Sequence, residues 1–335
     1  VQIWAAEQTM GNTAWYQGTA DAVRKQISEI RSTRAKYVLI LAGDHLYRMD
    51  FKTMADFHFS LDADITVAVQ PVSRNDAPRF GILKRSDNFK ITDFFEKPKD
   101  EETLKYAESR KNAEKPYLGS MGIYLFKTEV LIDLLDQIKA DDFGGEIIPA
   151  AIKTHNVYGY DFEGFWEDIG TIRTFYNTNL ALTKPNPPFN FYDPSKPIYS
   201  HPRFLPGSIV TNSMMEDTLL SEGCCITNAE IKHSIIGLRS QIKSGVKIKD
   251  SILMGNDYFE RDWKGEGKKL PLQISNNCSI EGAIIDKNAR LGENVAIRPF
   301  PQGTDIDGDQ WVVRDGIVII PKNSQVMPDT VIAPQ

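Results

Sequence analysis

Asp44 stands where a strand would end and where a carboxylate could hold a metal ion. It comes directly after Gly43 and the apolar run from Tyr37 to Ala42. The run predicts a buried strand, and the carboxyl ends of strands in open α/β sheets are where ligands bind. A carboxylate at that edge of the sheet, next to a glycine position with little room for a side chain, suggests that Asp44 holds a metal ion against a phosphate. An ordinary strand-to-turn carboxylate is the alternative interpretation.

Asp168 is a second carboxylate in the same kind of position, within Phe165–Thr171 (FWEDIGT), again at an apparent strand end and shortly before a glycine. Mg²⁺ prefers carboxylate and phosphate oxygens and often takes only one or two ligands from the protein. Asp44 and Asp168 together are therefore the candidate metal ligands. We interpret Glu167 as a solvated neighbour and His45 as a positioning residue.

Strand-like and helix-like segments that alternate over the first 180 residues must position these groups. Such alternation predicts a mainly parallel sheet covered by helices. A helix is expected at 19–32, with Thr19 as its N-cap. The other expected elements are a strand at 37–42, helices at 51–61, 100–114 and 129–137, strands at 64–70 and 122–126, and a hairpin of 80–84 with 90–96.

Prolines become dense between Lys184 and Pro206, which indicates a linker to a second domain, because they neither continue helices nor fit central strands. Beyond the linker, aliphatic residues recur in steps of five or six. This period is typical of a parallel β-helix, with an antiparallel sandwich as the competing interpretation. The expected inward residues are Ile226, Ile231, Ile236, Ile242, Ile248, Leu253, Ile274, Ile280, Ile285, Leu291 and Ile297. The charged stretch 257–270 interrupts the series and is expected to form a loop.

Bulk properties exclude several other classes. The 335 residues fit two domains, and a formal net charge of −6 without any basic run argues against a nucleic-acid-binding surface. No apolar stretch approaches the ~18–20 residues of a membrane helix. Three cysteines, two of them adjacent, indicate neither a disulfide framework nor a zinc site.

The blocks LILAGDHLYRMD (39–50) and FWEDIGT (165–171) resemble those of ADP-glucose pyrophosphorylases, and the resemblance covers essentially the whole chain. It implies an α/β fold, in which a mixed, mainly parallel Rossmann-like nucleotidyltransferase sheet precedes a left-handed parallel β-helix. The expected boundaries are a catalytic domain at 1–184, a linker at 185–206 and the β-helix at 207–335. In this family a Gly-rich nucleotide loop lies upstream of the matched region, so the chain is expected to lack that part.

The resemblance also implies an activity. Such enzymes transfer AMP from ATP to α-D-glucose 1-phosphate, giving ADP-glucose and pyrophosphate for glycogen or starch synthesis. In that family the matching aspartates hold Mg²⁺, so the resemblance implies the same role for Asp44 and Asp168. Positioning and charge neutralisation supply most of the catalysis in such phosphoryl chemistry.

Further matched segments supply the expected substrate contacts, although each alone is an ordinary turn. In FEKP (95–98), Lys97 would contact the sugar phosphate and Glu96 the glucose ring. The remaining expected contacts are Trp15, Tyr16, Gly18 and Thr19 around the nucleotide and sugar, with Gly81, Ser120 and Glu146 at the sugar.

Regulation is expected from the same resemblance. Relatives bind anionic sugar-phosphate effectors through basic residues, here Lys287 in Ile285–Arg290, whereas the match at Lys322 is poor. A solvated corner of the β-helix is the alternative for Lys287. The family further implies a homo- or heterotetramer, in the bacterial cytoplasm or the plastid stroma.

Other functions stay open. A non-catalytic regulatory subunit and a dTTP- or UTP-using sugar-1-phosphate nucleotidylyltransferase are the alternatives. An acyltransferase is disfavoured, because its chemistry needs clefts between long, unbroken β-helix coils.

Overall fold

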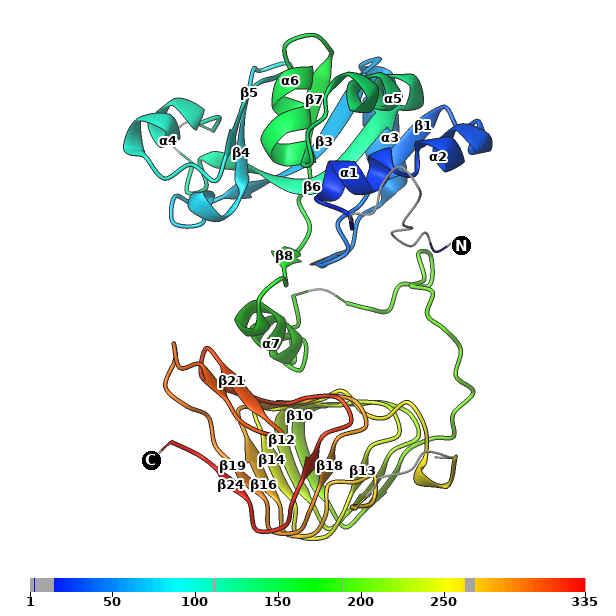
Figure 1. Ribbon diagram of the computed structural model, residues 1–335, viewed down its shortest axis with the longest axis vertical. Coiled ribbons are helices and arrows are strands. Elements are labelled where there is room, and N and C mark those ends of the chain that lie inside the picture. Colours follow the sequence, from blue (N-terminus) through cyan, green and yellow to red (C-terminus); the bar gives the residue numbers. More distant parts are fainter. Residues whose placement is uncertain (1–2, 4–14, 111–112, 189, 263–268, 335) are drawn as a thin grey trace. The chain divides into compact units, whose positions relative to one another are not determined.

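The computed structural model describes residues 3, 15–110, 113–188, 190–262 and 269–334 (Figure 1). The chain divides by its contacts into two compact units. The first contains Val1–Gly43 and Tyr47–Gly164, and the second contains Asp44–Leu46 and Phe165–Gln335. In the described part of the chain, no helix is both long enough and apolar enough to cross a membrane.

The first unit is built on a mixed sheet in the order β5-β4-β6-β3-β7, with β1 also paired to the long strand β6. Among the described strands, β3 and β7 pair in parallel and the other neighbours pair antiparallel. Four strands, β1, β3, β4 and β7, nevertheless share one direction. The strands are β1 (Tyr37–Ile40), β3 (Ile65–Val72), β4 (Gly81–Arg85), β5 (Ile91–Glu96), β6 (Tyr117–Lys127) and β7 (Val157–Asp161).

Helices cover both faces of this sheet, as the alternating side chains of β3 require. Ile65, Val67 and Val69 belong to a buried cluster that includes the apolar side of α5. Thr66 points to the other face, where its hydroxyl is 2.8 Å from Nδ1 of His58 on α3. The helical elements are α1 (Thr19–Arg24), α2 (Ile27–Thr33), α3 (Phe51–Ser60), η1 (Ala77–Arg79), α4 (Glu101–Ala107), α5 (Thr128–Gln137), η2 (Phe143–Ile147) and α6 (Ile148–Ala151).

Several element boundaries differ from those expected. The single helix predicted over 19–32 is two helices, and Gly18 rather than Thr19 is the N-cap of α1. The Thr19 oxygen accepts the Phe143 N–H at 3.2 Å rather than an N–H of its own helix, and its hydroxyl donates to Asp142. Helix α4 is shorter than predicted, beginning after the Asp100 cap and ending at Ala107. Strand β6 begins earlier than predicted and contains Ser120.

Strand β1 is less buried than predicted. Its first residue, Tyr37, is 39% exposed, and Leu41 just beyond it is 45% exposed. The reason is that β1, within the described residues, pairs only with β6 and so has one open edge. A Cβ atom at Gly43 would meet no atom of the described residues within 4 Å, so within that part of the chain crowding does not explain this glycine as the sequence had indicated.

The second unit begins with β8 (Trp166–Asp168) and α7 (Ile172–Ala181) and continues as a β-helix. Between α7 and β9, the described residues form neither helix nor strand. The β-helix strands are β9 (Ile209–Thr211), β10 (Met214–Leu220), β11 (Cys225–Thr227), β12 (Glu230–Ile236), β13 (Gln241–Ile242), β14 (Lys247–Lys249), β15 (Ile252–Leu253), β16 (Ser279–Glu281), β17 (Ala283–Ile285), β18 (Arg290–Leu291), β19 (Ala296–Ile297), β20 (Ile306–Asp307), β21 (Val312–Arg314), β22 (Ile317–Ile320), β23 (Gln325–Val326) and β24 (Val331–Ile332).

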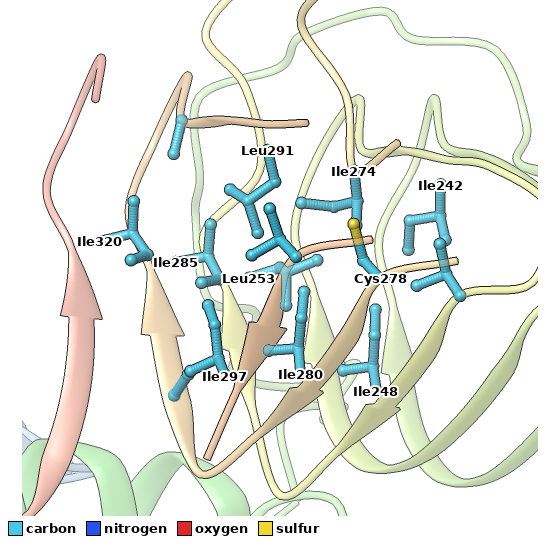
Figure 2. Close-up of a cluster of buried hydrophobic side chains, with 14 of the residues drawn as sticks. Ile242, Ile248, Leu253, Ile274, Cys278, Ile280, Ile285, Leu291, Ile297 and Ile320 are labelled. Carbon is cyan, nitrogen blue, oxygen red and sulfur yellow. The ribbon is translucent and has the colours of Figure 1, made fainter. Parts of the chain in front are cut away.

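The predicted aliphatic series forms the core of this β-helix. Every residue of the series belongs to one buried cluster, and Figure 2 shows several of them meeting inside the coils. Parallel pairing stacks them in register, for example Ile231 on Ile248 and Ile248 on Ile280. Cys278 lies in the same core, and all three cysteines are free. The β-helix prediction is confirmed, and the sandwich is excluded.

Asparagine and aspartate turn the corners of the coils. Asn212 and Asn228 have φ of 48° and 46°, a left-handed conformation that their short polar side chains tolerate. Successive corners also bond to one another, since Asn212 Nδ2 donates to Asn228 Oδ1 at 2.7 Å and Asn294 Nδ2 to Asp329 Oδ1 at 2.8 Å. In the interrupting stretch, Glu260–Asp262 forms a short 3-10 helix (η3), and the part of the predicted loop at 263–268 lies outside the described residues.

Candidate functional site

A two-stranded ribbon places Asp44 beside Asp168. Strand β2 (His45–Tyr47) pairs with β8, and the Ile169 N–H donates to the Asp44 carbonyl at 3.0 Å. A Cβ atom at Gly170 would lie 2.9 Å from Asp168 Oδ1 and 3.5 Å from Asp44 Oδ2. Both carboxylates therefore face the same glycine, and the absent side chain leaves the space between them open.

The neighbours of the two carboxylates fix their positions differently. Asp168 Oδ1 accepts the Gly170 N–H at 2.8 Å, which locks its rotamer. The Asp44 side chain is 68% exposed, and its Oδ1 lies 3.7 Å from His45 Nε2. Trp166 Nε1 donates to His45 Nδ1 at 3.3 Å, so a neutral His45 carries its proton on Nε2, toward Asp44. This geometry places the His45 ring beside Asp44, and the positioning role expected of His45 stays a prediction.

Two carboxylates fit a magnesium site in which a bound substrate supplies part of the ligands. Among the described residues, no group of three or more His, Cys, Asp or Glu side chains could hold a metal by itself. Mg²⁺ commonly keeps several waters and takes one or two carboxylates plus phosphate oxygens. The donors at Asp44 and Asp168 suit that kind of site rather than a closed metal cage.

In the first unit, Glu96 at the end of β5 lies close to two glycines. A Cβ at Gly81 would lie 2.4 Å from the Phe94 ring and 3.0 Å from Glu96 Oε2, and one at Gly144 would lie 3.4 Å from the same oxygen. Gly81 thus leaves room for the Phe94 ring, which is a structural reason beside the sugar contact predicted for it. The carboxylate of Glu96 meets the turn that contains Gly144.

Lys97 follows with a strained backbone. Its φ of 45° is uncommon for a residue with a long side chain, and its N–H donates to the Phe80 carbonyl at 3.2 Å. The side chain is 61% exposed, with Nζ 3.6 Å from Glu96 Oε1. Such outliers concentrate at functional sites. Here the turn places the exposed ammonium group of Lys97 beside the Glu96 carboxylate.

Ser120 is joined to a tyrosine that the sequence analysis missed. The Tyr124 hydroxyl hydrogen-bonds to Ser120, and burial raises the pKa of Tyr124 well above its usual value, with the charges of Asp142 and Glu96 raising it further. Gly122, between the two, has a φ of 64° that interrupts the regular strand. Their spacing of four residues in an apolar strand was the available signal, since such residues share a face.

Asp142 is the second missed residue. Its Oδ1 accepts from the Thr19 hydroxyl at 3.1 Å, and its Oδ2 accepts the Gly145 N–H at 2.8 Å as the N-cap of η2. Asp142 stands directly before the first residue of η2, and an aspartate at such a position is a capping pattern that the sequence does contain. Glu146, expected at the sugar, uses its Oε2 to accept the N–H groups of Asp141 at 3.1 Å and Asp142 at 3.4 Å.

The segment before α1 approaches the same turn. A Cβ at Gly18 would lie 2.3 Å from the Asp141 carbonyl oxygen, so this glycine permits the close contact of the two backbones. The Tyr16 hydroxyl accepts from Gln26 Nε2 at 2.9 Å, whereas the Trp15 side chain is 72% exposed. The structure thus joins Thr19 to Asp142 and leaves Trp15 at the surface.

Lys287 lies on the β-helix as expected, but it is not simply solvated. Its Nζ is 3.1 Å from Asp257 Oδ1, and Lys322 reaches the other oxygen of the same carboxylate. This cluster and the Asp44–Asp168 pair belong to the second unit. Glu96, Lys97, Ser120 and Glu146 belong to the first.

Comparison with known families agrees with both units. Residues 1–185 match the nucleotidyl transferase family, and residues 203–331 match the GLGC left-handed parallel beta-helix domain. The two together form the architecture of ADP-glucose pyrophosphorylase-like proteins. The first match spans more than half of the chain and agrees with the mixed α/β sheet, and the second gives the hand of the β-helix. The chain belongs to the nucleotidyl transferase family and is a sugar-phosphate nucleotidyltransferase with a left-handed β-helix domain.

Proposed function

We propose that this protein is a glucose-1-phosphate adenylyltransferase, which transfers AMP from ATP to α-D-glucose 1-phosphate and releases ADP-glucose and pyrophosphate for glycogen or starch synthesis. The observation that carries the proposal is the pair of carboxylates that face Gly170. The resemblance of the blocks around Asp44 and Asp168 to ADP-glucose pyrophosphorylases supports adenine over thymine or uracil.

The reaction joins a sugar-phosphate oxygen to the α-phosphorus of ATP, while the bond to pyrophosphate breaks. A Mg²⁺ ion held by Asp44 and Asp168 would neutralise charge on the phosphates. In this proposal Lys97 neutralises the attacking phosphate, Glu96 accepts hydrogen bonds from glucose hydroxyls, and the Ser120 hydroxyl both accepts from and donates to them. The sugar phosphate is already ionised, so the chain needs no general base. His45 serves to orient Asp44.

The other substrate contacts follow from the same proposal. Gly18, Thr19 and Gly81 would allow close approach of the ligand, with Trp15 and Tyr16 along the nucleotide and Glu146 at the sugar. Lys287 would bind anionic sugar-phosphate effectors, and a homo- or heterotetramer in the bacterial cytoplasm or plastid stroma would be the working form. The domain boundaries at 184 and 207 belong to this proposal as well.

The decisive test is pyrophosphate release from glucose 1-phosphate and Mg²⁺, with ATP, dTTP and UTP compared side by side. Release with ATP, lost in Asp44→Asn and kept in the control Glu167→Gln, is the expected result. Preference for dTTP or UTP would contradict the adenylyl assignment. No release by the chain alone, together with a change in the activity of an added catalytic subunit, would point to a regulatory subunit instead.

A further inference from the structure

Asp168 is joined directly to a helix that packs on the β-helix. It is the last residue of β8, and α7 begins four residues later, at Ile172. Between them, the Gly170 N–H donates to Asp168 Oδ1 at 2.8 Å, and Thr171 caps the helix by accepting the Thr174 N–H at 3.1 Å. The two threonines form a capping box, which fixes the direction in which the chain enters the helix. The position of the first turn of α7 therefore sets the position of Asp168.

Apolar packing holds the later turns of α7 but not its start. Tyr176 and Leu180 lie in a buried cluster with aliphatic residues of β15, β17 and β22, and the half-buried Phe175 packs against this cluster. Within the helix, all of which the structure describes, residues 172–174 include no buried side chain, and Ile172 is 36% exposed. The start of the helix therefore depends on a contact of another kind.

Arg173 supplies that contact. Its Nε donates to Asp315 Oδ2 at 2.8 Å, and its guanidinium also donates to the Asp315 carbonyl. The two side chains are partly shielded from solvent, at 29% and 34% exposed. Because the guanidinium is planar and contacts two oxygens of one residue, it fixes orientation as well as distance. Figure 1 shows α7 beside the hairpin strand β21, which ends directly before Asp315.

The β-helix holds Asp315 firmly. Asp315 and Gly316 form the tight turn between β21 and β22, with φ of 50° and 79°, as suits an Asp-Gly pair in a two-residue hairpin turn. The Asp315 N–H donates to Asp305 Oδ1 at 2.7 Å, and Asp315 Oδ1 accepts the Gly303 N–H at 2.7 Å. The Arg173 guanidinium, and after it the Gly303 N–H, lowers the pKa of the Asp315 carboxyl, which keeps its charge at neutral pH.

We propose that Arg173 is a positioning residue, which through its ion pair with Asp315 fixes the first turn of α7, and with it the carboxylate of Asp168, on the β-helix. The inference rests on the metal-binding part of the proposed function. It goes further, because Arg173 acts through α7 and would touch neither metal nor substrate. Without the ion pair, the first turn separates more often from the β-helix, and Asp168 spends less time facing Asp44.

Hydrogen exchange of the full chain, read by mass spectrometry on peptides that cover 165–172, tests this positioning without metal or substrate. The segment contains the Ile169 N–H bonded to the Asp44 carbonyl and the Gly170 N–H bonded to Asp168. Arg173→Met keeps an aliphatic side chain without the charge. It should speed exchange in this segment about threefold to fivefold, the loss expected of one partly exposed ion pair.

Two further variants assign the effect to this ion pair. Lys247→Met is the matched control, because Lys247 Nζ lies 4.0 Å from Glu230 Oε2 on the same β-helix, and it should leave exchange at 165–172 unchanged. Asp315→Asn removes the charge and tolerates the left-handed turn, so it should match Arg173→Met, and the double variant should exchange no faster than either single one. Unchanged exchange in Arg173→Met, equal acceleration in Lys247→Met, or additive effects in the double variant would overturn the proposal.

Mn²⁺ alone, titrated against the full chain by electron paramagnetic resonance, connects the positioning to the metal, since carboxylate sites for Mg²⁺ also suit Mn²⁺. The part of the binding that Asp44→Asn abolishes should weaken about threefold to fivefold in Arg173→Met. In the pyrophosphate assay, the same variant should raise the Mg²⁺ requirement and leave KM for glucose 1-phosphate unchanged. A general loss of stability would not separate the two. Mn²⁺ affinity equal to that of the parent chain would contradict the role of Arg173.

The two proposals fail separately. Mn²⁺ binding that Asp44→Asn leaves intact contradicts the proposed metal ligands, whereas exchange at 165–172 still decides whether Arg173 fixes Asp168. A chain that releases pyrophosphate but whose exchange does not respond to Arg173→Met keeps the proposed function and loses the positioning residue.

Discussion

His58 should make the first unit unstable in mild acid. This residue is 1% exposed between α3 and β3, with Nδ1 2.8 Å from the Thr66 hydroxyl and a buried Nε2 that has no hydrogen-bond partner among the described residues. Burial, and after it the charge of Lys127, lowers the pKa of His58 to about 4, although Asp64 and Asp62 act in the opposite direction. The folded unit therefore holds this imidazole in its neutral form.

The size of the effect follows from the difference between the pKa of His58 in the unfolded chain and its pKa in the folded unit. An unfolded chain protonates His58 near pH 6.5, whereas the folded unit resists protonation until about pH 4. The stabilisation is complete above pH 6.5 and is lost as the pH falls toward 4. The free energy of unfolding should drop by about 2 kcal/mol between pH 8 and pH 5 on account of this group alone.

Urea unfolding of the chain at pH 8, 7, 6 and 5 measures how the free energy of unfolding changes with pH. Limited proteolysis, with identification of the peptides released from the first unit, assigns each transition to that unit. His58→Leu should remove about 2 kcal/mol of the pH dependence, while the control His201→Gln, at an exposed position, should keep it. An NMR titration of the His58 ring gives the folded pKa directly. A His58→Leu slope equal to that of the parent chain, or a ring that titrates near pH 6.5, would refute the reasoning.

Three further substitutions probe the first unit. Lys97→Ala should raise the requirement for glucose 1-phosphate far more than that for ATP, with stability changed by less than about 0.5 kcal/mol because the side chain is 61% exposed; equal effects on both substrates in steady-state kinetics would contradict its role. Tyr124→Phe should cost about 1 kcal/mol in urea unfolding, because it removes the hydrogen bond between the Tyr124 and Ser120 hydroxyls, although Ser120 Oγ still accepts the Gly122 N–H at 3.3 Å, and it should raise KM for glucose 1-phosphate; an unchanged KM would separate Tyr124 from the sugar. Gly18→Ala should cost about 1–3 kcal/mol, since the new Cβ would overlap the Asp141 carbonyl, and an unchanged urea midpoint would show that the two backbones separate freely.

Periodicity predicted the second unit better than the first. In the β-helix each aliphatic residue points inward at a fixed step, so the pattern that runs from Ile226 to Ile297 specifies the core directly. In the first unit the existence of most elements was predictable, but their ends depend on tertiary contacts. The hydroxyl of Thr19 bonds to Asp142, 123 residues away, and no local pattern around the helix contains that partner.

The candidate site, too, could be predicted from the sequence only in part, because it depends on tertiary contacts. Asp44 and Asp168 were found as strand-end carboxylates, and their shared position at Gly170 follows from the β2–β8 ribbon, which neither short segment predicts alone. Tyr124 and Asp142 were missed, because a buried tyrosine and a capping aspartate have ordinary structural explanations. Their relation to Ser120 and Thr19 emerges only when the sheet and the turn at η2 are in place.

The glycines explain why residue type alone cannot locate a ligand. Gly18 and Gly81 are surrounded by protein, namely the Asp141 carbonyl and the Phe94 ring, so packing accounts for the missing side chain. At Gly43 a Cβ atom would meet no atom of the described residues within 4 Å, whereas at Gly170 the nearest atoms it would meet belong to the two carboxylates. A glycine that the protein does not fill, beside groups that prefer a cation, is better evidence for a ligand than a glycine that the fold needs. By this criterion Gly170 supports the proposed metal position more strongly than Gly43, the glycine that first drew attention to Asp44.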